Sequence, residues 1–114
     1  MPRDAQGRLR QAMISEEERI VIMGRLYDFY GQLLTPHRQR IYEMAVYEDL
    51  SLAEIAEREG ISRQAVHDLL RRTTAMLEQY EEKLKMMHRF DAIRAIASSL
   101  EDRELAQRII KELD

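Results

Sequence analysis

Apolar residues recur at helical spacing along most of the chain, and polar capping residues divide this pattern into successive helices. Over residues 15–34 they stand three or four positions apart, on a stripe so wide that we expect burial from two sides. Ser15, followed by three glutamates, has the form of a capping box with carboxylates near the positive end of the helix dipole. The pattern predicts a first helix from residue 15 to about residue 34.

A second helix is predicted over residues 36–47. Thr35 supplies a capping hydroxyl, and Pro36 occupies the first helical position, where its missing N–H costs nothing. We expect the apolar positions of this helix to face the core and its polar run to be solvated. That run comprises Arg38, Gln39 and Arg40.

Residues 51–74 have the outline of a helix-turn-helix, the most specific signal in the chain. Ser51 and Glu54 have the spacing of a capping box at the start of its first helix. Gly60 stands where the chain must turn sharply, and a left-handed backbone costs glycine almost nothing. We expect Ile61 to fill the corner between the two helices and Ser62 to cap the second helix.

The second helix of this unit has no breaker before about Arg89, so a long fourth helix is predicted. Its apolar side repeats with heptad-like spacing through Val66, Leu70, Thr73, Leu77, Tyr80, Leu84 and Met87. A recognition helix needs only a few turns, so the rest of this seam must pack on another helix. That helix belongs either to the same chain or to a second copy. In a homodimer the predicted interface comprises Thr73, Leu77, Tyr80, Leu84 and Met87.

Two interruptions are predicted after the seam. Phe90-Asp91 marks the first, with Asp91 as the cap of a fifth helix. Ser98-Ser99 is a candidate for the second, before a last amphipathic segment that ends near Leu113.

The chain is expected to be all-α, a helical bundle that contains the helix-turn-helix. Its 114 residues include only 4 Gly and 2 Pro, a balance that favours helices and suits one domain. We predict a mildly basic tail over 1–15 and a single helical domain over 16–114. Within that domain the helix-turn-helix occupies 51–74, and a helical extension follows over 75–114.

Composition and charge indicate which cellular compartment and which kinds of binding partner to expect. The absence of cysteine excludes disulfides and thiolate metal ligands and fits a reducing compartment. No apolar run approaches the roughly 20 residues of a membrane span, and the N-terminus lacks the core of a signal peptide. We therefore expect a cytoplasmic protein that does not contact a membrane. The formal net charge of −3 counts against nucleic-acid binding, since neutralising phosphates drives that affinity.

The outer face of the second helix in the helix-turn-helix is nevertheless locally basic. Between Ser62 and Thr74, three arginines stand against the single acidic residue Asp68. Arginine binds guanine edges or phosphate, and glutamine pairs with adenine, so the pattern predicts a nucleic-acid surface. Its candidate contact residues are Arg63, Gln64, His67, Arg71 and Arg72. The same kind of unit is also reused for protein contacts.

Catalytic, cofactor and metal sites are not expected. His37, His67 and His88 each stand alone, without a metal-ligand partner at helical spacing. The chain has no glycine-rich phosphate loop, and no nucleophile has a base at a readable spacing. We expect a binding protein, not an enzyme.

Four segments of the chain resemble the bacterial YlxM-like family. They read LYDFYGQLLT at 26–35, DLSLAEIA at 49–56, ISRQAV at 61–66 and YEEKL at 80–84, within a match from about residue 20 to 90. The helix-turn-helix also resembles region 4 of sigma factors, in the winged-helix-like superfamily of DNA-binding domains, although no clear wing is present. Family members commonly carry an aromatic residue at the position of His67 and an amide at that of Leu69.

The resemblance implies a homodimer and a regulatory role in the signal recognition particle pathway, because the family's genes tend to lie beside those of the particle's GTPases. Two functions remain open. The first is nucleic-acid binding, with DNA or the particle RNA as the partner. The second is a protein-interaction module that docks a protein of the targeting pathway without binding nucleic acid.

Overall fold

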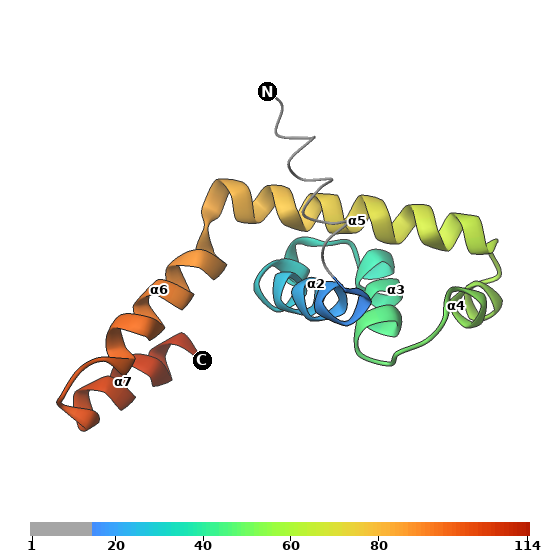
Figure 1. Cartoon of the computed structure of the whole chain (residues 1–114). Helices are drawn as coiled ribbons and strands as arrows, with labels where there is room; N and C mark the ends of the chain where they lie inside the picture. Colours follow the sequence, from blue (N-terminus) through green and yellow to red (C-terminus); the bar gives the residue numbers. More distant parts are fainter. Residues whose placement is uncertain (1–14) are drawn as a thin grey trace.

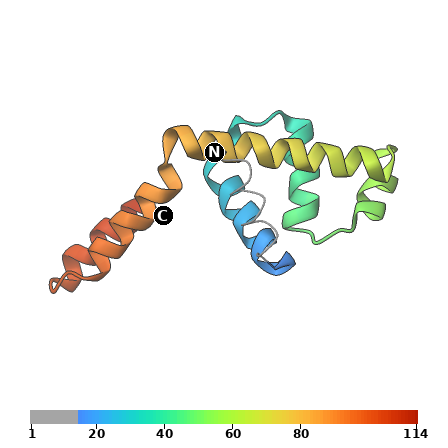
Figure 2. The same ribbon diagram turned by 45° about the horizontal axis from the view of Figure 1, so that its top comes forward.

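A computed structural model describes residues 15–114, and this part of the chain contains six α-helices, one 3-10 turn and no strand. The all-α prediction is confirmed. Four helices form the body of the molecule: α2 (Glu16–Tyr30), α3 (Pro36–Val46), α4 (Leu52–Glu59) and α5 (Arg63–Leu84). Two further helices, α6 (Met86–Ser98) and α7 (Arg103–Leu113), form a hairpin that projects from the body at one end of α5 (Figures 1 and 2). The tail predicted over 1–15 lies outside the described residues except for Ser15.

Polar caps begin the helices of the body where the sequence predicts them. The side-chain oxygens of Ser15, Thr35, Ser51 and Ser62 each accept a hydrogen bond from the backbone N–H three residues further on. At α4 the box is reciprocal, because the Ser51 backbone N–H also donates to Glu54 at 3.0 Å. The first helix ends earlier than predicted, since Gly31–Leu33 form a 3-10 turn.

Two apolar clusters hold the body together, and α5 contributes to both. The first cluster joins α2 and α3 to α5 through Leu26, Tyr30, Leu34, Tyr42 and Leu77. The second joins α3 and α4 to α5 through Ile41, Met44, Ile55, Ala56 and Val66. Helix α5 is therefore the helix against which α2, α3 and α4 pack, and Figure 1 shows it running along the body.

The polar run of α3 joins this helix to its neighbours and is not simply solvated as predicted. Arg38 donates to the hydroxyl of Thr73 on α5 at 2.9 Å. Arg40 binds both carboxylate oxygens of Glu59, at 2.8 and 3.3 Å, and so fixes the end of α4 against α3. Hydrogen bonds from Arg40 lower the pKa of the Glu59 carboxyl.

The long helix ends at Leu84, and the predicted continuation to about Arg89 is wrong. Lys85 adopts a left-handed backbone with φ 55° and ψ 28°, and α6 begins directly after it at Met86. Neither glycine nor proline stands at this kink, so the local sequence does not predict it.

The carboxylate of Glu81 caps the first turn of α6. Its two oxygens accept from the backbone N–H groups of Met87 and His88, each at 3.0 Å, and it also accepts from the hydroxyl of Tyr30. The same hydroxyl accepts from the backbone N–H of Met86 at 3.0 Å. Three of the four amides that the start of a helix leaves unpaired are thereby satisfied by side chains from α2 and α5.

The predicted interruption at Phe90-Asp91 is also wrong, because both residues lie within α6 and attach it to α2. The rings of Phe90 and Phe29 meet edge to face with centroids 5.1 Å apart. Asp91 accepts from Arg25 at 2.6 Å. The interruption at Ser98-Ser99 is confirmed, since α6 ends there and α7 folds back along it.

The α6–α7 hairpin packs through small residues. Ala97 and Ala106 are almost completely buried, which allows the two helix backbones to approach closely. Its outer side leaves larger apolar groups in solvent, above all Ile96, which is 65% exposed. None of the described helices is long and apolar enough to cross a membrane.

Candidate nucleic-acid interface

Helices α4 and α5 form the predicted helix-turn-helix. Gly60 has φ 68° and ψ 32°, and its backbone N–H donates to the carbonyl of Ala56, which closes α4. Ile55 and Val66 are fully buried and hold the two helices together. Ile61 is 37% exposed, so it covers the corner only in part and does not fill it as predicted.

The five predicted contact residues are all exposed on the first half of α5, at the end of the molecule opposite the hairpin (Figure 1). The side chain of Arg71 is 64% exposed and that of His67 is 58% exposed. Within residues 15–114, Arg63 and Arg72 form neither an ion pair nor a hydrogen bond with another side chain. Within this part of the chain, no side chain occupies the donors of either guanidinium group.

These residues do not form a single compact patch. Arg63 and Arg72 are nine positions apart, which places them roughly 180° apart around a helix of 3.6 residues per turn. Gln64, His67 and Arg71 lie in the arc between them. Because a groove of DNA surrounds an inserted helix on more than one side, such an arc fits base contacts at its centre and phosphate contacts at its edges.

Asp68 lies inside this arc and contacts three of its members through one oxygen. Its Oδ1 atom accepts from Nε2 of Gln64 at 3.2 Å. The same atom is 3.8 Å from Nδ1 of His67 and 4.0 Å from a guanidinium nitrogen of Arg71. The charge of Arg71 is therefore partly neutralised, whereas Arg63 and Arg72 form no ion pair within residues 15–114.

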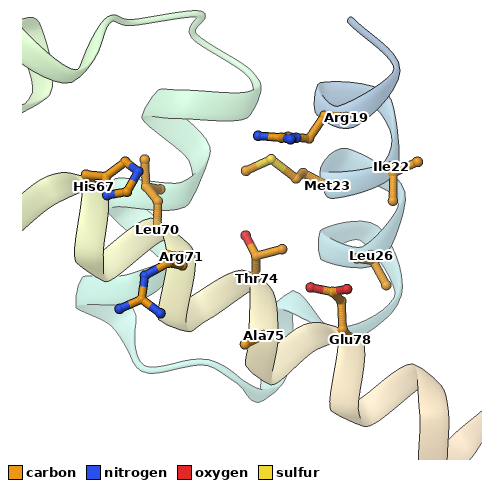
Figure 3. A pocket seen from close by; sticks show the side chains of 10 residues that line it. All are labelled: Arg19, Ile22, Met23, Leu26, His67, Leu70, Arg71, Thr74, Ala75 and Glu78. Atoms are coloured by element: carbon orange, nitrogen blue, oxygen red, sulfur yellow. The ribbon is translucent and has the colours of Figure 1, made fainter. Parts of the chain in front are cut away.

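A groove of about 570 Å³ adjoins the arc and separates α5 from α2. Figure 3 shows His67 and Arg71 on the α5 side and Arg19 and Met23 on the α2 side. Arg19 lies far from the helix-turn-helix in sequence and is missing from the predicted site. Only the packing of α2 against α5 brings this arginine beside His67 and Arg71.

The predicted dimer seam is largely used within the chain. Thr73 and Leu77 are 1% and 0% exposed, because α2 and α3 cover them, so neither side chain is available on the surface of the single chain. Tyr80 and Met87 are half-buried against the first apolar cluster. Leu84 alone of the five is a large exposed apolar residue, at 50%. The helices that cover this seam are therefore mainly α2 and α3 of the same chain.

Metal coordination and shifted pKa values are two further properties of the described part of the chain. No group of three or more histidine, aspartate or glutamate side chains there is placed to hold a metal ion. Several titratable side chains with shifted pKa values pack in the core or cap helices, whereas Glu78, whose pKa is raised by burial, lines the groove between α2 and α5. Burial raises the pKa of Tyr42 to about 12, with its hydroxyl 2.8 Å from that of Thr74.

The body is all-α, and its α4–α5 unit exposes a basic arc at one end. These features place the chain in the class of helix-turn-helix proteins. The chain belongs to the UPF0122 family: the family model described as "Putative helix-turn-helix protein, YlxM / p13 like" matches residues 17–114. This agrees with the resemblance read from the sequence.

Several curated relatives carry the same family name. The chain is 54% identical to UPF0122 protein GK1195 of Geobacillus kaustophilus over 87 residues, which cover 75% of the chain and 77% of the relative. It is 39% identical to UPF0122 protein RBAM_015800 of Bacillus velezensis over 104 residues, which cover 85% and 94%. A relative from Shouchella clausii, UPF0122 protein ABC2295, is 49% identical over 79 residues, covering 68% and 72%.

Proposed function

We propose that the chain is a DNA-binding regulatory protein that inserts the first half of α5 into the major groove. The observation that carries the proposal is the pair of arginines at the edges of the exposed arc, Arg63 and Arg72, which have no ion-pair partner within residues 15–114. Membership of a helix-turn-helix family supports the same use of the unit. Gln64, His67 and Arg71 would face base edges, and the two outer arginines would bind phosphates.

The protein would act as a homodimer in the cytoplasm, linked to the signal recognition particle pathway. The resemblance to YlxM-like proteins supports both the dimer and the pathway. The particle RNA is the second nucleic acid to consider. Duplex RNA hides its major groove from side chains, so contact with it would rely on phosphates and unpaired loops.

Titrations of labelled nucleic acid test the proposal. The purified protein is titrated by fluorescence anisotropy against duplex DNA from its own operon and against the particle RNA, each at two salt concentrations. Binding through phosphates must weaken steeply as salt rises, and each lost phosphate contact should reduce the log–log slope by about 0.9 on duplex DNA. We expect the double variant Arg63→Ala/Arg72→Ala to show weaker binding and a shallower slope.

A charge-matched control separates contact from net charge. Arg103 and Arg108 are exposed on α7, at the other end of the molecule, and Arg103→Ala/Arg108→Ala removes the same two charges. If the two double variants bind alike, α5 is not the contact surface. If the wild-type protein binds neither nucleic acid at low salt, the proposed function fails.

The alternative is a protein-interaction module of the targeting pathway. It is favoured by the net charge of −3 and by the isoleucines on the outer side of α6, where Ile93 is 41% and Ile96 is 65% exposed. Exposed apolar groups of this kind form the centres of protein interfaces. Titration against the particle protein, with Ile96→Ser as the variant, distinguishes this function: binding that survives high salt and is lost with Ile96 supports it.

A further inference from the structure

The carboxylate of Asp68 is the acidic group on the exposed arc of α5 that runs from Arg63 to Arg72. Its side chain is 42% exposed, and its Oδ1 atom lies within 4.0 Å of donors from Gln64, His67 and Arg71. Gln64 is the neighbour that is hydrogen-bonded to it, and Arg71 is an ion-pair neighbour; these two residues stand at positions i−4 and i+3 on the same helix.

A carboxylate that approaches DNA is repelled by the phosphates and needs a donor in the groove. In the major groove, guanine presents two acceptors, thymine presents an acceptor and a methyl group, and adenine presents an acceptor beside its amino group. Cytosine alone presents an amino donor without an acceptor of its own. The base edge that best satisfies Asp68 is therefore that of cytosine.

We infer that Asp68 is the residue that determines specificity on this face: it selects cytosine at one position and weakens binding to every other duplex. The inference rests on the proposed function. Gln64 donates a 3.2 Å hydrogen bond to Asp68, and this bond orients the Gln64 side chain before DNA binds. The arginines at the edges of the arc provide affinity, and the aspartate between them provides discrimination.

Selection from a duplex library with a randomised core tests the inference. The wild-type protein is compared with Asp68→Asn and with Glu101→Gln. Glu101 is exposed in the loop between α6 and α7, so its variant makes the same change in net charge far from α5. Asparagine has the size of aspartate and the site is exposed, so the variant should fold, which circular dichroism checks.

We expect the wild-type protein and Glu101→Gln to enrich sites with one fixed cytosine, favoured roughly 5- to 100-fold over other bases. Asp68→Asn should lose the preference at that position alone and bind random duplex roughly three- to tenfold more tightly. If it keeps the same preference, or if the wild type binds DNA without preferring cytosine, the inference is wrong while the proposed function stands. If the wild type binds no duplex at all, the proposed function fails first.

Discussion

The hydroxyl of Tyr30 on α2 donates to the carboxylate of Glu81 on α5, and together these two side chains cap the first turn of α6. The kink at Lys85 thus depends on a contact between residues far apart in the sequence. This contact determines where α5 ends and in which direction the α6–α7 hairpin projects.

Replacement of Tyr30 by phenylalanine should destabilise the protein by about 1–2 kcal/mol. The ring remains in the core, but Glu81 loses a donor and the Met86 amide loses its acceptor. Urea denaturation followed by circular dichroism measures the change. Tyr80→Phe is the matched control, because the half-buried Tyr80 lies beside Tyr30 and its hydroxyl has no hydrogen bond within residues 15–114. Equal losses in the two variants would rule out a capping role for Tyr30.

The contribution of Glu81 should disappear in acid. Burial opposes ionisation of this carboxyl, but hydrogen bonds from Tyr30 and from the Met87 and His88 amides outweigh it and lower its pKa. The stabilisation is then fully present above the unfolded pKa, near 4.3, and is lost as the pH falls through the lower folded value.

The difference in unfolding free energy between wild type and Glu81→Gln should accordingly be largest near neutrality and shrink below a pH of about 4. Denaturation curves at a series of pH values measure it. A difference that stays constant across the series would mean that the ionised carboxylate does not cap α6.

Replacement of Gly60 in the turn of the helix-turn-helix should destabilise the protein because of the backbone conformation there, not because of a steric clash. A Cβ at Gly60 would meet nothing within 4 Å, yet the backbone there has φ 68°. We expect Gly60→Ala to cost about 1–2 kcal/mol, with a smaller loss for Gly60→Asn because asparagine adopts the left-handed region more readily. Thermal denaturation of both variants ranks them, and equal losses would mean that the left-handed backbone at Gly60 is not the cause.

Two leucines of the heptad-like seam should behave differently. Leu77 is fully buried among α2, α3 and α5, so Leu77→Ala should cost about 2–5 kcal/mol through lost contacts and a cavity. Leu84 is half exposed at the end of α5, and Leu84→Ala should cost less than about 1 kcal/mol. Denaturant titration of the two variants side by side measures the contrast. A comparable loss at both positions would mean that the seam is covered along its whole length.

Dimerisation should therefore be probed at Leu84, because a charge at Leu77 would disrupt the core of each chain. If the exposed end of the seam joins two copies, Leu84→Glu should convert a dimer to a folded monomer in sedimentation experiments. A folded variant with unchanged mass would exclude this end of α5 from the interface.

Local signals in the sequence predicted the body of the fold well. The capping hydroxyls of Thr35, Ser51 and Ser62, together with Gly60, act within a few residues, so their positions identify helix ends without knowledge of the remaining chain. The exposed contact candidates on α5 were predictable for the same reason, since helical periodicity separates them from the buried positions Val66, Thr73 and Leu77.

Features that depend on contacts between distant residues were not predictable. Periodicity showed that the seam of α5 must be covered, but not that α2 and α3 of the same chain cover Thr73 and Leu77. Arg19 joins the contact region only through the packing of α2 beside α5.

The sequence by itself determined that the chain is all-α, where the helices of the body begin, and which side of α5 faces solvent. These properties follow from capping chemistry and from the period of the α-helix, which act over a few residues. Only the tertiary structure decided where α5 ends, because the left-handed Lys85 is held by Tyr30 and Glu81. It also decided which part of the seam remains exposed, since burial depends on neighbours that the chain brings together only when it folds.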